Sequence, residues 1–412
     1  MRRQVVITGI GAVTPIGSGS AGLYKGLRNE RSAIGTITRF DAAAFNCRIA
    51  GEVRDFDGSA YVDQKRLRRL DRYAQFAVAC ARLALDDARL DLTDENRDAV
   101  GCFVGSALGG AAFAEEQHAV FLSQGARRIK PSLALAVFCG AASCNIAIEY
   151  DLRGPSSANS DSCASGAIAI GHAFRAVRDG YADVMLAGGV EAPLTPLIFG
   201  AFDVIRAMST RNAEPAQACR PFDRGRDGFV MAEGAALLVL EEREHALRRG
   251  ASTYGRILGY GNSNDAHHMT APLPSGAQAA RAMRDALAEA ELAPDQIDYV
   301  NAHASSTPLN DTAETLAIKH VFGEHAYRIP ISGTKPMHGH ALGATGAIEA
   351  AICLLALQHG YVPPTLNLEV PDPTCDLDYV SETGRELAPR YVLSNSFGFG
   401  GINASLVFGR TA

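Results

Sequence analysis

The sequence predicts an α/β protein made of two similar halves. Short apolar runs typical of buried strands alternate with longer helical segments. Of the 412 residues, 47% are hydrophobic and 20% are charged, which supplies enough apolar side chain for a large core. A stretch of 18 residues is also repeated further along the chain. Together these three features favour a folded, duplicated α/β protein over a disordered one.

The alternation of strands and helices can be placed on the chain. Apolar runs predict strands at Val5–Gly9, Val100–Gly105, Val184–Gly188 and Ala235–Leu240. Helical periodicity predicts helices over Asp71–Arg89 and Gln278–Glu291. No Pro- or Ser-rich linker separates these segments, so we expect any domains to be tightly joined.

An internal repeat indicates a duplication. Ala164–Tyr181 and Ala344–Tyr361, which lie 180 residues apart, are identical at seven of 18 positions. Each segment is typical of a helix that follows a Gly-rich turn and ends at a glycine. A repeat of this length is too long for a solenoid unit. We therefore predict two halves with one fold, 1–250 and 251–412, with the site near their junction.

Composition disfavours several classes of protein. The net charge of −6 and the pI of about 6.0 disfavour general binding to nucleic acid or to membrane surfaces. Residues 131–148 carry no charge, but their Ala, Ser and Asn content favours a buried helix over a membrane span. Nine cysteines without a C-x-x-C pair, and no signal sequence, predict reduced thiols in the cytoplasm.

One cysteine is placed for chemistry. In GPSSANSDSCASGAIAI, Cys163 follows small polar residues and precedes a helix too apolar to be exposed. The positive end of a helix and its free N–H groups favour a thiolate and can form an oxyanion hole. Small neighbours leave room for a substrate to reach the sulfur. For a lone cysteine, a buried structural role is the alternative.

Two histidines and a lysine lie in the second half. His303 follows the end of an apolar strand, where polar residues of α/β sites usually lie. Lys335, His338 and His340 occupy a Gly-rich turn before the second repeated helix. No acidic or Cys partner stands at metal-ligand spacing from His338 and His340, so we expect no metal and no other cofactor. For either histidine alone, an ordinary core or surface position is the alternative.

Acyl transfer through a thioester is the chemistry that this set indicates. Cys and His at different strand ends suit nucleophilic acyl transfer. A hydrolase needs one His oriented by Asp or Asn, whereas two histidines and a lysine suit the stabilisation of a developing oxyanion. The C-terminal segment LSNSFGFGGINASLVF sets glycines around two phenylalanines, which allows close backbone approach and loop movement.

Further motifs run in order through nearly the full chain. They are VVITGIGAVTPIG at the start, LRGPS before the cysteine, STRN at 209–212, RPFDRGRDGFV at 220–230, DAHHMT at 265–270 and the C-terminal NSFGFGG. The ordered set resembles the β-ketoacyl-acyl-carrier-protein synthases, most of all the elongating type II enzymes. The resemblance implies a thiolase-like fold of two pseudo-symmetric βαβαβαββ halves in α-β-α-β-α layers, usually as a homodimer.

The same resemblance implies a ping-pong condensation and a role for each residue. Cys163 would take an acyl chain from acyl-carrier protein, and malonyl-carrier protein would then lose CO₂ to give the attacking enolate. His303 and His340 would hydrogen-bond the malonyl thioester oxygen. Lys335, paired with Glu314, would maintain the electrostatics of the site.

The resemblance also implies the pocket and the carrier surface. Backbone N–H groups of Cys163 and Phe399 would form the oxyanion hole, with Phe399 gating the acyl pocket. Substrate contacts match Leu108, Phe202, Thr270, Ser305 and Thr307. An acidic carrier needs a basic patch on this acidic enzyme, and the matching cations are Lys65, Arg68, Arg69, Arg127, Arg128 and Arg206.

Several residues beside the site depart from the family pattern. Asn159 replaces an apolar residue, Ser162 an alanine, Ala304-Ser305 a Gly-Thr pair, and Pro336 and His338 a serine and a threonine. The predicted function is 3-oxoacyl-[acyl-carrier-protein] synthase in fatty-acid elongation. These departures keep open a specialised ketosynthase of polyketide or polyene biosynthesis, which could require a chain-length-factor partner in a heterodimer.

Two rival classes are disfavoured by the cysteines. A degradative thiolase uses a second cysteine near its C-terminus, and no cysteine follows Cys375. A chain-length-factor subunit lacks the nucleophile, whereas Cys163 is present here.

Overall fold

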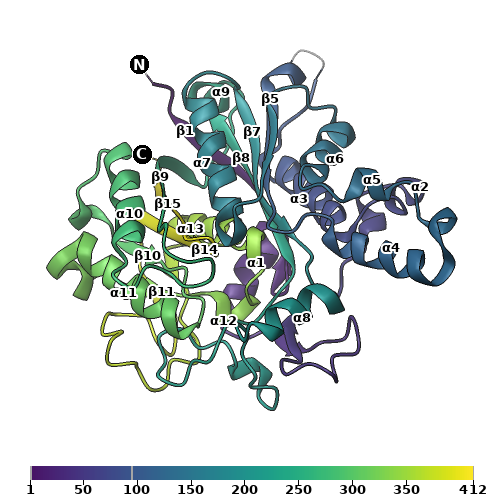
Figure 1. Ribbon diagram of the computed structural model, residues 1–412. Helices are drawn as coiled ribbons and strands as arrows, with labels where there is room; N and C mark the ends of the chain where they lie inside the picture. The colour runs from purple at the N-terminus through teal and green to yellow at the C-terminus, as the bar shows by residue number, and fades with distance from the viewer. Residues whose placement is uncertain (1, 94–95, 412) are drawn as a thin grey trace.

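A large mixed sheet forms the framework of the protein. The computed structural model describes residues 2–93 and 96–411. The strands of the main path are β1 (Val5–Thr14), β5 (Val100–Gly105), β6 (Ser156–Asn159), β7 (Val184–Glu191), β8 (Gly234–Glu242), β9 (Gly255–Asn264), β10 (Tyr299–Asn301), β11 (Ile331–Ser332), β14 (Tyr391–Gly398) and β15 (Ile402–Gly409). Within the described residues their order is β11-β10-β14-β15-β9-β1-β8-β7-β5-β6 (Figure 1). Short additional strands are β2 (Gly17–Ser18), β3 (Ile34–Thr36), β4 (Ile49–Gly51), β12 (Tyr361–Val362) and β13 (Arg385–Glu386).

The two halves of this sheet share one strand pattern. In the first half, β5 pairs in parallel with β6 and β7, and the β7–β8 and β8–β1 pairs are antiparallel. In the second half, β10 pairs in parallel with β11 and β14, and the β14–β15 and β15–β9 pairs are antiparallel. The halves meet where β1 and β9 pair over three residues. The duplication expected from the repeat is therefore visible in the topology, while the boundary at 250 stays a prediction.

Helices lie on both faces of each half-sheet. The long ones are α3 (Arg72–Ala88), α6 (Ala141–Tyr150), α7 (Ser165–Arg178), α10 (Ala277–Glu289), α11 (Pro308–Phe322) and α13 (Thr345–His359). α7 and α13 pack on each other and on strands of both halves, whereas α3 covers β1 and β8 and α10 covers β9 and β15 (Figure 1). The layers therefore follow the order α-β-α-β-α, as predicted. The other helices are α1 (Gly19–Arg28), α2 (Gln64–Leu67), α4 (Ala111–Gln124), α5 (Leu133–Ala136), α8 (Pro196–Val204), α9 (Arg243–Arg248) and α12 (Lys335–His338).

The two repeated helices cross at matching glycines. A Cβ on Gly166 of α7 would lie 3.0 Å from the backbone N of Ala347, and a Cβ on Gly346 of α13 would lie 3.0 Å from that of Ala167. Only small residues permit this approach, which brings the N-terminal ends of α7 and α13 together at the centre of the protein. The segment Leu342–His359 is long and apolar enough for a membrane span, but 89% of it is buried, so it is a core helix.

The predicted elements are found where the sequence placed them, with one exception. The four expected strands lie within β1, β5, β7 and β8, and the two expected helices are α3 and α10. The prediction of one buried helix over 131–148 is wrong, because the chain breaks between α5 and α6. Leu135 and Ile148 are 71% and 70% exposed. Lack of charge there therefore marks an apolar surface and not a core helix.

Candidate active site

Cys163 lies in a short turn at the start of α7. The turn, Ser162–Ala164, leads directly into the helix, and the cysteine is only 8% exposed. Gly398 at the end of β14 approaches so closely that a Cβ there would lie 3.0 Å from the Cys163 backbone nitrogen. The cysteine, predicted as the nucleophile, is therefore held between its own helix and the C-terminal loop.

Two histidines from the second half face this cysteine. Nε2 of His340 lies 3.1 Å from Sγ of Cys163, and Nδ1 of His340 lies 2.9 Å from Oγ1 of Thr345. The ring of His303 is 5.4 Å from that of His340, centre to centre. Burial, followed by the Lys335 charge, holds the pKa of each histidine well below its usual range. Both rings are therefore neutral, and each can donate one N–H hydrogen bond.

A buried lysine links the two histidine segments. Lys335 is fully buried, and its Nζ donates to the carbonyl oxygen of His303 and, at 2.6 Å, to Oε1 of Glu349. The predicted pairing of Lys335 with Glu314 is wrong. Glu314 instead accepts hydrogen bonds from the backbone N–H groups of His303 and Ala304, both at 2.8 Å. Its carboxylate shapes the loop, because its two oxygens are already occupied by that backbone.

The cysteine is not a resting thiolate of low pKa. Burial raises the pKa of the Cys163 thiol to about 11, although Ser162, Lys335 and the backbone of Phe399 all favour the thiolate. Oγ of Ser162 lies 3.9 Å from the sulfur, at the far limit of a hydrogen bond to sulfur. The expectation that the helix end would give a thiolate is therefore not met, because desolvation outweighs the nearby positive groups.

A cavity of about 340 Å³ opens onto the cysteine and both histidines. Five residues predicted from the resemblance line it: Phe202, Thr270, Ser305, Thr307 and Phe399, and the predicted docking residue Arg206 joins them. Leu108 does not line this cavity and instead packs in the apolar cluster that contains Cys163. Phe399 stacks on Phe202 with ring centres 6.3 Å apart, so the two rings together form one wall.

The residues that depart from the family pattern lie around the site, at the end of β6, in α12 and in the turns that contain Ser162 and Ala304. Asn159 donates to the carbonyl oxygen of Ser165 at 3.1 Å. His338 is fully buried with Nε2 3.1 Å from Oγ1 of Thr334, and burial lowers its pKa to about 3. His338 and His340 thus have different partners, and no group of three or more His, Cys, Asp or Glu side chains suited to a metal occurs in 2–93 or 96–411.

Three buried residues were missed from the sequence. Glu349 is the only acidic residue in the second repeated helix, ATGAIEAAICLLALQHGY, and an acid amid so many apolar neighbours could have been recognised as the partner of a buried cation. Thr345, which contacts His340, gave no such signal. Arg226, in RPFDRGRDGFV, holds the loop after His303.

The predicted docking cations are on the surface. All six are exposed, and none of them forms an ion pair with another residue of the described part of the chain: Lys65, Arg68, Arg69, Arg127, Arg128 and Arg206. Two neighbours behave differently, because Lys130 pairs with Glu116 at 3.1 Å and Arg66 pairs with Glu149. The exposed six are therefore available for an acidic partner.

Comparison with known proteins settles the family. Residues 2–246 match the N-terminal domain of β-ketoacyl synthases, and residues 254–369 match the C-terminal domain. This chain belongs to the β-ketoacyl synthase family. The expectation of an acyltransferase of the ketosynthase type is thereby confirmed.

Full-length relatives and solved structures agree with this assignment. The chain is 47% identical to 3-oxoacyl-[acyl-carrier-protein] synthase 2 of Synechocystis sp., over 99% of this chain and 98% of the relative. It is 46% identical to the protein of that name from Coxiella burnetii, over 99% of each chain. A type II polyketide ketosynthase solved with its acyl-carrier protein superposes with a TM-score of 0.93 at 36% identity, over 100% of both chains. The ketosynthase is thus thiolase-like in fold, as predicted.

The hydroxyl of Ser162 gives a test of the cysteine environment. Because Ser162 favours the thiolate, Ser162→Ala should raise the pKa of Cys163 further and lower its thiolate fraction at any pH below that value. We expect iodoacetamide alkylation of Cys163 at pH 8 to slow several-fold, with the rate recovering as the pH rises. Mass spectrometry of the labelled peptide measures the rate, and Ser160→Ala is the matched control. An unchanged rate would show that the hydroxyl does not act on the sulfur.

Proposed function

We propose that this ketosynthase is a 3-oxoacyl-[acyl-carrier-protein] synthase of fatty-acid elongation. It joins a Cys163-bound acyl chain to malonyl-carrier protein by decarboxylative Claisen condensation. The observation that carries the proposal is one nucleophilic thiol facing two neutral imidazoles in a single cavity. The relatives named 3-oxoacyl-[acyl-carrier-protein] synthase 2 support it over the full chain.

The first half-reaction is acyl transfer to sulfur. Cys163 attacks the carbonyl carbon of the acyl thioester, and the carrier thiol leaves with the proton that Cys163 gives up. The neutral His340 ring, 3.1 Å from the sulfur, stands where that proton can be received and passed on. Backbone N–H groups of Cys163 and Phe399 hold the oxygen of the tetrahedral intermediate.

The second half-reaction forms the carbon–carbon bond. Malonyl-carrier protein loses CO₂, and the electrons of the broken bond form an enolate whose oxygen accepts hydrogen bonds from His303 and His340. Neutral rings suit this role because each donates an N–H without carrying a charge of its own. The enolate carbon then attacks the Cys163 thioester and expels the thiolate. Burial, and then the charge of Lys335, lower the pKa of both histidines and keep them neutral.

Separate roles for the cysteine and the histidines can be tested. Cys163→Ala should abolish condensation, with no acyl group on another cysteine. His303→Ala or His340→Ala should cut malonyl decarboxylation by about two to three orders of magnitude, the usual cost of losing an oxyanion donor. Acylation of Cys163, followed by intact-mass spectrometry with carrier-bound substrates, should persist in His303→Ala and slow in His340→Ala, because His340 also receives the cysteine proton. His172→Ala, outside the cavity, is the control, and variants that decarboxylate but fail to acylate would reverse the roles.

We propose acyl-carrier protein as the partner, docked on the exposed cations. Acidic carriers are attracted to basic patches, and such rim charges act mainly on association and salt sensitivity. Their range is about 8 Å at physiological ionic strength. The ketosynthase solved with its acyl-carrier protein supports this choice of partner.

Charge reversal tests the docking surface. Replacing Arg68, Arg69, Arg127 and Arg128 together by Glu should raise the KM for carrier-bound substrate at least several-fold. The KM for a free pantetheine thioester should barely change, because that substrate needs no docking surface. The control is Arg281→Glu on α10, an exposed arginine outside the set. Equal losses on both substrates would contradict the docking surface.

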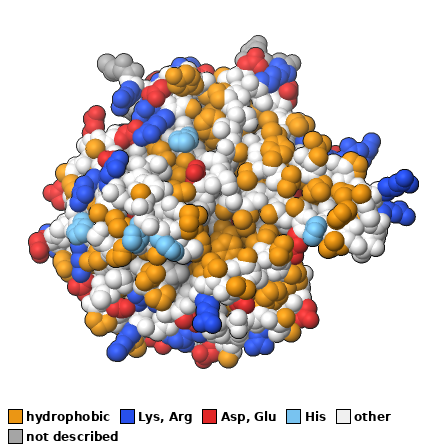
Figure 2. All heavy atoms as spheres, in the orientation of Figure 1, with side chains coloured by type: hydrophobic (Ala, Val, Ile, Leu, Met, Phe, Trp, Pro, Cys, Tyr) orange, Lys and Arg blue, Asp and Glu red, His pale blue; other side chains and the backbone are white. Residues whose placement is uncertain are grey.

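A second copy of the chain is the proposed occupant of the apolar surface near α5. Exposed apolar side chains gather there: Phe121, Leu122, Leu135, Val137, Phe138 and Ile148. Figure 2 shows such side chains over the right-hand part of the molecule. Next to them β6 ends the sheet with one free edge, and α6 contacts it. Free strand edges pair readily, and two copies of β6 can pair about a two-fold axis.

The homodimer gives a definite molar mass. Light scattering of the purified chain should give about twice its 43.5 kDa. Phe138→Asp with Ile148→Asp should shift the protein toward monomer, whereas Leu247→Asp on α9 should not. A monomer that forms a stable complex only with a chain-length-factor-like subunit would replace the homodimer by a heterodimer. Ketosynthases with chain length factors occur among the similar structures.

The nine reduced cysteines of the described chain suit the cytoplasmic location that we propose.

A further inference from the structure

The loop from His303 to Pro308 keeps its shape against backbone strain. Ala304 and Ser306 have φ of +44° and +68°, in the left-handed region that non-glycine residues rarely adopt. Ala304 stands where the family pattern has glycine, so this residue carries a Cβ in that conformation. Its Cβ also excludes any side chain at Gly333, where a Cβ would lie 2.4 Å away. Such a conformation persists only where surrounding contacts fix it.

Two carboxylates of α11 anchor different ends of this loop. At the histidine end, Glu314 accepts from the backbone N–H groups of His303 and Ala304. At the other end, Oδ1 of Asp311 accepts from the backbone N–H of Ser306 at 3.2 Å. The hydroxyls of Ser305 and Thr307, which line the cavity and lie 2.9 Å apart, belong to that second end.

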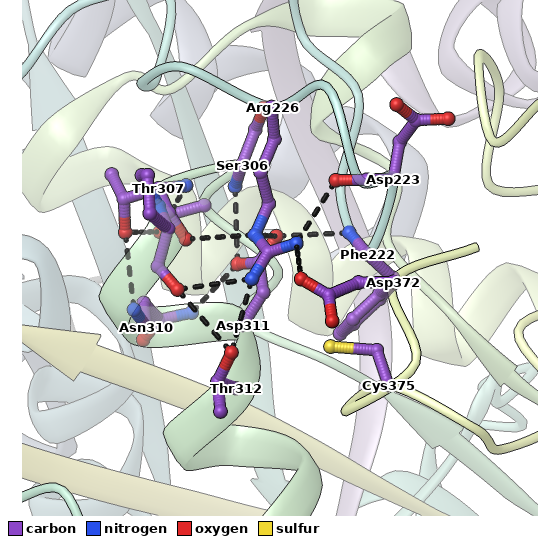
Figure 3. A network of polar contacts seen from close by, with 12 residues as sticks. Phe222, Asp223, Arg226, Ser306, Thr307, Asn310, Asp311, Thr312, Asp372 and Cys375 are labelled. Atoms are coloured by element: carbon purple, nitrogen blue, oxygen red, sulfur yellow. Dashed lines mark hydrogen bonds and ion pairs between the residues drawn. The ribbon is translucent and has the colours of Figure 1, made fainter. Parts of the chain in front are cut away.

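A buried arginine completes the second anchor. Figure 3 shows the Arg226 side chain directed at the loop, and it is only 4% exposed. Its Nε donates to the carbonyl oxygen of Thr307 at 3.3 Å, and Nη2 donates to that of Pro308 at 3.0 Å. Nη1 pairs with Asp372 at 2.7 Å, and Asp311 lies 3.7 Å from Nε. A planar fork reaches these partners at once, which a lysine ammonium cannot do.

We propose that Arg226 is a positioning residue for the pantetheine arm of the substrate. It holds the carbonyl groups of Thr307 and Pro308, directly after the Thr307 side chain, so that the hydroxyls of Ser305 and Thr307 keep their places in the cavity. The inference rests on the proposed function, because it takes the arm of an acyl-carrier thioester as the ligand. His303 has its own anchor in Glu314, so Arg226 governs binding of the arm and not the chemistry at the histidine.

The test separates binding from chemistry. Arg226→Lys should raise the KM for an acyl-pantetheine by about tenfold, the loss expected for one hydrogen bond to a charged group. The kcat should stay within about twofold, since the histidine end is anchored separately by Glu314. Iodoacetamide, which has no pantetheine, should alkylate Cys163 at the unaltered rate.

The control is a second buried arginine of the same segment. Arg220 is 6% exposed, and its guanidinium contacts Gln217, Asp223 and Glu369 but not the carbonyls of Thr307 and Pro308. Arg220→Lys should leave the KM unchanged. Equal effects of the two lysine variants, or a fall in kcat without a change in KM, would overturn the inference.

A milder variant covers the possibility of misfolding. Asp372→Asn removes one charged partner of Arg226, and the Asp372 side chain is less buried, at 21% exposed. This variant should also raise the KM, by a smaller factor than Arg226→Lys. If Arg226→Lys does not fold, an unchanged KM in Asp372→Asn overturns the inference. If the unaltered enzyme does not catalyse condensation, the proposed function is overturned. If it does, but the KM for acyl-pantetheine is the same in Arg226→Lys, only this inference is overturned.

Discussion

The fully buried contact between Lys335 and Glu349 is the interaction on which the site depends. An isolated charge cannot be buried at this depth, and removing one partner of such a pair typically costs about 3 to 5 kcal/mol. Glu349 lies near the start of the second repeated helix and pairs with Lys335. The lysine in turn binds the carbonyl oxygen of His303 and lowers the pKa of both His303 and His340. The ion pair therefore holds the His303 segment in place and adds to the effect of burial on the pKa of both histidines.

The duplicated fold explains why these groups meet. Cys163 lies in the turn before α7, and His340 lies shortly before α13, so the crossing of the two repeated helices brings the cysteine and the histidine within 3.1 Å. The turn before each helix has kept its shape, but Gly343 stands at the position that matches Cys163. Its backbone N–H binds the buried carboxylate of Glu191 at 3.0 Å. One copy of the turn thus serves chemistry, and the other serves the packing that supports it.

Sequence reasoning succeeded where a local pattern has one physical meaning. The strands, the repeated helices and the small-residue turn around Cys163 follow from periodicity and from the need for access to the sulfur. It failed where the outcome depends on distant partners. The apolar helix around Glu349 indicates an acid that needs a buried cation, but it does not show that this cation is Lys335. Glu314 also lies on a helix that follows a histidine. The uncharged residues near Leu135 were predicted to be core, because a sequence does not show which apolar face stays exposed.

Burial serves the two halves of the reaction in opposite ways. It keeps His303 and His340 neutral, which suits donation to an enolate oxygen. The same burial raises the pKa of Cys163 to about 11, which disfavours the thiolate needed for attack. A second positive charge near the sulfur would lower the pKa of the thiol. That charge would also bind the malonyl carboxylate tightly in the ground state, which does not speed the reaction. The contact between Cys163 and a neutral His340 avoids the conflict. The imidazole can receive the proton as the sulfur attacks, so the thiolate need exist only during the reaction and not at rest. On this account the nucleophile is activated by position, and the only fixed positive charge near the sulfur, among the residues described, is that of Lys335, which Glu349 balances.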